Sequence, residues 1–147
     1  MLKRDSKGFT LIELLIVVAI IGIIAAIAIP NLLNAIDRGK QKRTMADMRS
    51  IGTAVESYAV DNNVYPIATT AAVLQTLVAP IYIKTMPTQD GWNNTFQVAA
   101  ATNQYTLYST GKDGSGSTCT AGTTVTFNDE ICFINGQFLR YPQGTQQ

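Results

Sequence analysis

An apolar segment near the N-terminus, with a single carboxylate in it, constrains this chain more than any other feature. The stretch from Phe9 to Ile29 contains Glu13 as its only charged residue. As an α-helix it would be about 30 Å long, which matches the hydrocarbon thickness of a bilayer. The sequence therefore predicts a membrane-spanning helix whose preceding basic residues stay on the cytoplasmic side.

The charge of Glu13 requires a partner. An ionised carboxylate costs about 3 kcal/mol at the centre of a bilayer and somewhat less near the end of a helix. The cations closest in sequence, Lys3, Arg4 and Lys7, all precede the apolar run and cannot follow Glu13 into it. Glu13 therefore indicates an interaction with a positive group from elsewhere.

These residues resemble the N-terminus of type IV pilins and of the pseudopilins of type II secretion. A short basic leader precedes Gly8-Phe9-Thr10-Leu11-Ile12-Glu13, and the aliphatic run ends at Pro30. In that family a prepilin peptidase of the membrane cleaves after the residue that matches Gly8 and methylates the new amino terminus, here Phe9. The resemblance implies that Glu13 of one subunit pairs with the Phe9 amine of its neighbour in a filament.

A cleaved secretory signal and a plain membrane anchor are the two simpler interpretations of the same segment. The apolar run is too long for an ordinary signal, and its small residues, Ala26 and Ala28, lie where a helix is expected to continue. We therefore divide the N-terminal part into a leader, residues 1–8, and a transmembrane and filament-core helix, residues 9–30.

Helical periodicity continues through residues 31–62 as the amphipathic second half of the helix. Four apolar residues recur there at intervals of three or four, as one face of a helix requires: Met48, Ile51, Val55 and Tyr58. The pattern predicts one helix from Phe9 to near Asn62, whose second half packs against a globular head.

Gly22 and Pro30 weaken the first half of this helix. Glycine is a poor helix former, and proline removes one hydrogen bond and clashes with the preceding turn. A simple kink is one interpretation. Local melting, which lets subunits pack, is the other, and it is implied by the resemblance to pilin filaments.

The remaining residues, 63–147, are predicted to form the globular head of an α+β protein with a small antiparallel sheet. A short helix is expected at residues 71–78, and two antiparallel strands at residues 95–99 and 104–109. One hairpin strand and a tight loop are expected between the two cysteines.

Further motifs resemble the head of the major pseudopilin and of the pilins built on the same head. They are Asn63–Pro66, Asp90–Phe96 and Leu107–Gly114. Trp92, inside the second motif, is interpreted as an aromatic core residue because buried aromatic side chains dominate small cores.

Cys119 and Cys132 are the only cysteines. In a domain exported beyond a bacterial inner membrane, a pair of cysteines indicates a disulfide rather than a metal or redox site. A bridge across a loop of this size stabilises by about 3 kcal/mol in the chain-entropy model.

Calcium is a second interpretation of this region, and it rests on the resemblance. The major pseudopilin binds calcium in the loop after its Gly-x-Asp-Gly stretch, and Asp113 and Asp129 match its two acids. Ser115 and Ser117 could add oxygen ligands. The insertion around Cys119 departs from the pattern, so a disulfide in place of the ion, or a solvated turn, is the alternative.

Composition excludes several functions. The chain contains no histidine, so Ser-His, Cys-His and histidine-based zinc sites are absent, and we expect no enzyme. Lys and Arg number 11 against 10 Asp and Glu, and only residues 38–43 form a basic cluster. We interpret this cluster as a solvated helix face or an interfacial anchor. A contact with acidic groups of neighbouring subunits or with DNA stays open, although no nucleic-acid partner is predicted.

Taken together, these features predict a structural subunit of a type IV pilus that forms a homopolymer through its N-terminal helix. The precursor would be a single-pass protein of the inner membrane, processed by prepilin peptidase and assembled by the pilus or secretion machinery into an extracellular fibre. The disulfide loop and Thr-rich region favour the pilus. The alternatives are the major pseudopilin of a type II secretion system, in a periplasmic pseudopilus, and a monomeric membrane-anchored binding module.

Overall fold

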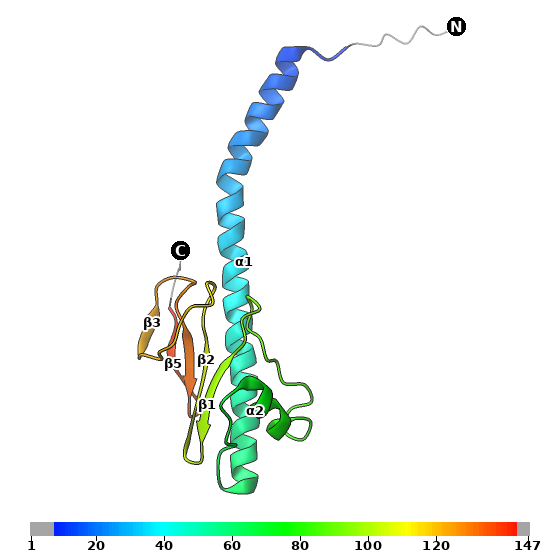
Figure 1. Ribbon diagram of the computed structural model, residues 1–147. Coiled ribbons are helices and arrows are strands. Elements are labelled where there is room, and N and C mark those ends of the chain that lie inside the picture. Colours follow the sequence, from blue (N-terminus) through cyan, green and yellow to red (C-terminus); the bar gives the residue numbers. More distant parts are fainter. Residues whose placement is uncertain (1–7, 144–147) are drawn as a thin grey trace, which may run out of the picture. The chain divides into compact units, whose positions relative to one another are not determined.

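The computed structural model describes residues 8–143, so the predicted leader, apart from Gly8, lies outside the described residues. The chain divides into two compact units, residues 1–35 and 36–147. Helix α1 (Leu11–Asn62) begins in the first unit and ends in the second (Figure 1). The prediction of one helix that ends near Asn62 is confirmed.

The part of α1 in the first unit has an exposed apolar surface on all sides. Every Val, Ile, Leu and Phe from Phe9 to Leu33 is exposed, with fractions between 45% for Val17 and 77% for Leu11. Among the described residues, α1 is the one helix long and apolar enough to cross a membrane. A helix without a polar face has no side that water solvates well, so this surface requires cover by lipid or by other protein.

The part of α1 in the second unit buries one face. Met48, Ile51 and Val55, which share a face by their spacing, are fully buried. Tyr58, the fourth member of the predicted stripe, is half-buried and packs against the same core. The predicted apolar stripe is therefore confirmed.

The head contains one five-stranded sheet that lies along this part of α1 (Figure 1). In chain order, the strands are β1 (Gln97–Ala101), β2 (Gln104–Ser109), β3 (Gly122–Thr124), β4 (Ile131–Ile134) and β5 (Gln137–Pro142). Their order across the sheet is β1-β2-β4-β5-β3, and every neighbouring pair is antiparallel except β3 and β5. The predicted α+β fold with a small, mainly antiparallel sheet is confirmed.

Helix α2 (Ala71–Val78) has the predicted range. Thr70 caps its start, because the Thr70 hydroxyl accepts a hydrogen bond from the backbone N–H of Val73 at 3.3 Å. Leu74 and Val78 are buried in the head core. The helix ends before Pro80, which has no N–H to continue it.

The first strands lie close to their predicted positions. The range expected at residues 104–109 matches β2, whereas β1 begins and ends two residues later than residues 95–99. The shift arises because Thr95 forms an isolated bridge with Gln89 instead of joining the ladder with β2.

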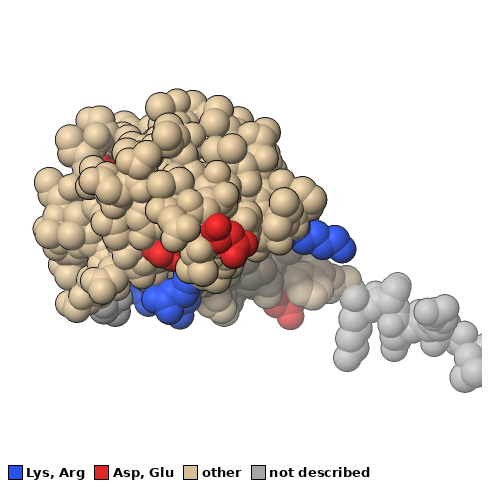
Figure 2. Space-filling model, turned by 90° about the horizontal axis from the view of Figure 1, so that it is seen from below, with Lys and Arg blue, Asp and Glu red and all other residues tan. Residues whose placement is uncertain are grey.

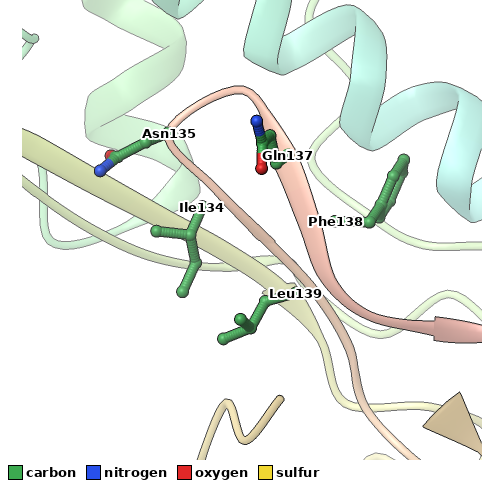
Figure 3. A pocket seen from close by; sticks show the side chains of 5 residues that line it. All are labelled: Ile134, Asn135, Gln137, Phe138 and Leu139. Carbon is green, nitrogen blue, oxygen red and sulfur yellow. The ribbon is translucent and has the colours of Figure 1, made fainter. Parts of the chain in front are cut away.

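The prediction for the segment between the cysteines is wrong in one respect. The strand found there, β3, pairs in parallel with β5 and is not part of a hairpin. The hairpin is instead β4–β5, which is not among the predicted elements. It turns at Asn135 and Gly136, with φ of 45° and 84°, and an Asn-Gly pair favours two-residue turns because both positions need positive φ. Figure 3 shows this turn from close by, with Phe138 and Leu139 on opposite sides of β5.

Gly52 allows the closest approach between α1 and the sheet. A Cβ at this position would overlap the ring of Phe133 in β4 and come within 3.2 Å of the Tyr105 hydroxyl. Both aromatic residues belong to the head core. Gly52 therefore lets α1 lie directly on the sheet, although glycine lowers helix propensity.

Candidate functional site

Glu13 closes a capping box at the start of α1. Its carboxylate Oε2 accepts the backbone N–H of Thr10 at 2.9 Å and the Thr10 hydroxyl at 2.7 Å, and the Glu13 N–H donates to the Thr10 Oγ1 at 3.3 Å. Glu13 thus has neutral donors within its own chain, but no cation among the described residues pairs with it. Thr-x-x-Glu before an apolar run is the sequence signal for this cap, which an argument from charge alone does not reveal.

Gly8 and Phe9 precede the first residue of α1 and lie outside regular secondary structure. Both are exposed, and the Phe9 side chain is 75% exposed. A Cβ on Gly8 would meet nothing within 4 Å, so any steric demand for glycine here must come from a molecule that binds this segment.

Gly22 and Pro30 both lie inside α1, and the helix is continuous through them. A Cβ at Gly22 would also meet nothing within 4 Å, so packing in this chain does not explain that glycine. The basic cluster at residues 38–43 is only partly exposed: Arg43 is exposed and pairs with Asp47 at 3.6 Å, whereas Lys40 is half-buried. Charged side chains are few and scattered on the face of the head in Figure 2.

A buried polar contact joins α1 to the loops of the head. Asp37, 6% exposed, accepts the indole N–H of Trp92 at 3.0 Å and the ammonium of Lys112 at 2.8 Å. Trp92 is half-buried and lies outside the apolar core, so its interpretation as a core residue is wrong. Its indole N–H requires a polar partner when it is covered, and Asp37 supplies that partner.

Electrostatics favour the charged form of Asp37. Burial alone would raise the pKa of its carboxyl group, but the hydrogen bonds from Lys112 and Trp92, together with the positive charges of Lys112 and Lys40, outweigh burial and hold the pKa below its ordinary value. Two sequence motifs of the head, one around Trp92 and one around Lys112, therefore meet at one carboxylate of α1.

Asp90 organises the loop that presents Trp92. Its Oδ1 accepts the backbone N–H groups of Trp92 and Asn94, each at 2.9 Å, and its Oδ2 accepts the Ser109 hydroxyl at 2.6 Å. The Gly91 N–H donates to Thr44 on α1 at 2.9 Å. These bonds fix the loop to both α1 and the end of β2.

The predicted disulfide between Cys119 and Cys132 is confirmed. Cys132 is fully buried in β4, and the bridge holds the long segment between β2 and β4 against the sheet. On β5, Arg140 lies beside this segment and pairs with Glu130 at 2.6 Å and with Asp129 at 3.5 Å.

The residues expected to hold calcium do not fit the ion. Asp129 Oδ2 accepts the backbone N–H groups of Val125 at 2.5 Å and Thr126 at 2.9 Å, and its Oδ1 faces Arg140. Asp113 is exposed, and its Oδ1 accepts the Ser115 N–H at 3.0 Å. Calcium needs six to eight oxygens with free lone pairs, whereas donors of this chain already engage the Asp129 oxygens. Within residues 8–143 no group of three or more His, Cys, Asp or Glu side chains could hold a metal ion.

A pocket of about 380 Å³ lies at the β4–β5 turn (Figure 3). It is lined by Ile134, Asn135, Gln137, Phe138 and Leu139. None of these side chains titrates near neutral pH, so this pocket offers no acid or base for catalysis.

Pilin-like subunits have a long helix whose first half is apolar and exposed and whose second half packs against a folded head. This chain has both features. A family model for the prokaryotic N-terminal methylation motif matches residues 3–29, and a model for type II secretion system (T2SS), protein G, matches residues 31–127. The chain belongs to this type II secretion system protein G family.

Relatives of known identity agree with this assignment. The type II secretion system core protein G of Aeromonas hydrophila is 35% identical, over 80% of this chain and 91% of its own length. That of Pseudomonas aeruginosa is 34% identical, over 78% of this chain and 89% of its own length. The type IV major fimbrial protein FimA of Dichelobacter nodosus is 53% identical, but over only 41% of this chain and 38% of its own length.

The prediction of a type IV pilus subunit is therefore wrong, and the alternative of a major pseudopilin is correct. The pilus interpretation relied on the disulfide loop. However, the match to the protein G model runs to residue 127 and so includes Cys119 and most of this loop, which shows that the loop does not exclude a pseudopilin.

Membership of this family bears on three further points. The family is structural, so the prediction that the chain is not an enzyme is confirmed. The methylation motif and the protein G match also imply processing by a prepilin peptidase and assembly with the secretion machinery. Together with the apolar helix, the motif indicates a precursor inserted in the inner membrane.

Proposed function

We propose that this chain is the repeating subunit of a periplasmic pseudopilus and that it polymerises through the apolar half of α1. Support comes from the large exposed surface of that half, which no described residue of its own unit covers. In the membrane, lipid covers this surface. After extraction, the same half of neighbouring subunits covers it, so residues 9–30 form the filament core while residues 31–62 and 63–147 form the head-bound helix and the head.

Cleavage after Gly8 supplies the cation that Glu13 lacks. Before cleavage the nitrogen of Phe9 is a neutral amide, and afterwards it is a positive, N-methylated amine. Among the described residues of one subunit, Glu13 accepts hydrogen bonds from Thr10 alone, and Thr10 carries no charge. In an apolar filament core, the Phe9 amine of an adjacent subunit neutralises the carboxylate, which lowers the cost of burying both charges.

The segment from Gly22 to Pro30 is where α1 deforms as subunits pack. It contains the weakest helix formers of the apolar half, and a Cβ at Gly22 would meet nothing within 4 Å, so packing within its own unit does not account for the glycine. Deformation here lets the core helices adjust while each head keeps its own fold.

The replacement Glu13→Gln tests this function. It preserves side-chain size but removes the charge, so we expect pseudopili recovered by shearing to fall by at least about tenfold, relative to the membrane pool of subunit. Asp61→Asn, an exposed change near the end of α1, is the matched control and should leave the yield unchanged.

Normal yield from Glu13→Gln would contradict charge pairing. Intact-mass analysis of both variants should show mature chains that begin at Phe9 with one added methyl group. Chains that still carry residues 1–8 within filaments would contradict the cleavage step.

A further inference from the structure

The C-terminal loop of the head, residues 110–132, contains two neighbouring acids whose only described cation is Arg140. The Asp129 and Glu130 side chains are 24% and 14% exposed, and the Arg140 side chain between them is 20% exposed. Two like charges with this little exposure repel each other unless a cation is shared between them.

The position of Arg140 lets it serve both acids at once. Its Nη1 donates to Glu130 Oε2 at 2.6 Å and its Nη2 lies 3.5 Å from Asp129 Oδ1. The planar guanidinium offers several donors in a fixed arrangement, which suits a pair of carboxylates better than an ammonium does.

The backbone of Arg140, in β5, lies between β3, which belongs to this loop, and β4, at which the loop ends. In β5, Arg140 is aligned with Gly122 of β3 on one side and with Cys132 of β4 on the other. Cys132 in turn forms the bridge to Cys119. The guanidinium and the disulfide therefore hold the same loop from two neighbouring positions of the sheet.

We propose that Arg140 is the resident cation of this loop, so that the head closes and stays folded without a bound metal ion. The oxygens of Asp129 that a divalent cation would need are used by Arg140 and by the N–H groups of Val125 and Thr126. A divalent ion beside the guanidinium would also be repelled by it. The proposal concerns the head alone and does not depend on how subunits polymerise.

Thermal unfolding of the oxidised, detergent-solubilised full chain tests this proposal, with near-UV circular dichroism recorded in EGTA and in excess CaCl₂. We expect the unfolding midpoint to agree within about 1 °C between the two conditions. A calcium site filled at a hundred times its Kd would raise the midpoint by on the order of 10 °C, and such a rise would overturn the proposal.

Substitutions test the role of Arg140 in EGTA. We expect Arg140→Gln to lower the unfolding midpoint by roughly 5 °C or more. Arg140→Lys keeps the positive charge but loses the paired N–H donors of the guanidinium, so its midpoint should lie between those of Arg140→Gln and the unchanged chain. Lys84→Gln removes the same charge at an exposed position of the head; it is the control and should shift the midpoint by less than about 1 °C. If Arg140→Gln and Lys84→Gln unfold at the same temperature, Arg140 is not the cation that holds the loop. If Arg140→Gln does not fold at all while Arg140→Lys does, the proposal is supported.

Discussion

The two halves of α1 belong to one helix, but different surroundings stabilise them. From Phe9 to Leu33 every large apolar side chain is exposed, and the described polar side-chain contact at the start of the helix is the Thr10–Glu13 cap. From Asp37 onward, the helix buries Met48 and Ile51 completely, and its polar residues bond to the head. The first half needs cover by lipid or by other protein, whereas the second half is covered within its own chain.

This difference separates assembly from folding. Because the core of the head includes only the second half of α1, changes in the first half should alter filament yield without unfolding the head. Changes in the head should alter its free energy of unfolding while leaving membrane insertion intact. Each prediction below tests whether that separation holds.

Loss of the disulfide should have the largest effect on the head. Replacing both Cys119 and Cys132 with Ser should lower the free energy of unfolding by about 3 kcal/mol, because the unfolded chain regains the freedom of the closed loop. Chemical denaturation of the detergent-solubilised subunit measures this loss. Membrane insertion should not change. A lower membrane-inserted fraction at an equal total amount of subunit would contradict the separation of insertion from folding of the head.

Gly52 and Gly39 form a matched pair of substitutions within the second half of α1. Gly52→Ala places a methyl group against Phe133 and should cost about 2 kcal/mol. Gly39→Ala meets open space and should stabilise the helix by up to about 1 kcal/mol. Equal effects in denaturant titrations would show that α1 does not pack on the sheet as closely as described.

Acid should weaken the contact of Asp37 with the head. The pKa of Asp37 is lowered in the folded state, so its stabilisation is present above the unfolded pKa of about 3.9 and is lost as pH falls through the folded value. Asp37→Asn should cost about 1 kcal/mol at neutral pH and flatten the fall in stability below pH 4. Fluorescence of Trp92, the single tryptophan, can measure both the stability at neutral pH and its change with acid. If stability falls with acid in the same way in Asp37→Asn as in the unchanged chain, the ionised Asp37 does not stabilise this contact.

Sequence patterns predicted those parts of the fold that depend on local periodicity. The stripe through Met48 and Val55 gave the buried face of α1, and the Ala71–Val78 helix follows from a short apolar run that ends before Pro80. The partner of β3 could not be predicted, because a three-residue strand carries no pattern that selects a parallel neighbour. The β4–β5 hairpin was predictable from Asn135-Gly136.

The features that the sequence does not predict are contacts between residues far apart in the chain. Nothing local marks Asp37 as the acceptor for Trp92 and Lys112, which lie 55 and 75 residues away in the chain. The same holds for Arg140, whose acids precede it by ten residues and more. The pairing that the motif Gly8–Glu13 implies stays a prediction, because it joins two subunits and the structure of one chain does not test it.

Solid-state NMR of mixed-label pseudopili tests the central claim most directly. Filaments assembled from equal amounts of ¹⁵N-labelled and ¹³C-labelled subunits can give a cross-peak between the Phe9 amine nitrogen and the Glu13 side-chain carboxyl carbon only through a contact between two subunits. Our account predicts this cross-peak in mixed filaments. Its absence there, together with its presence in filaments in which every subunit carries both labels, would show that Glu13 pairs with the Phe9 amine of its own chain and would contradict the account.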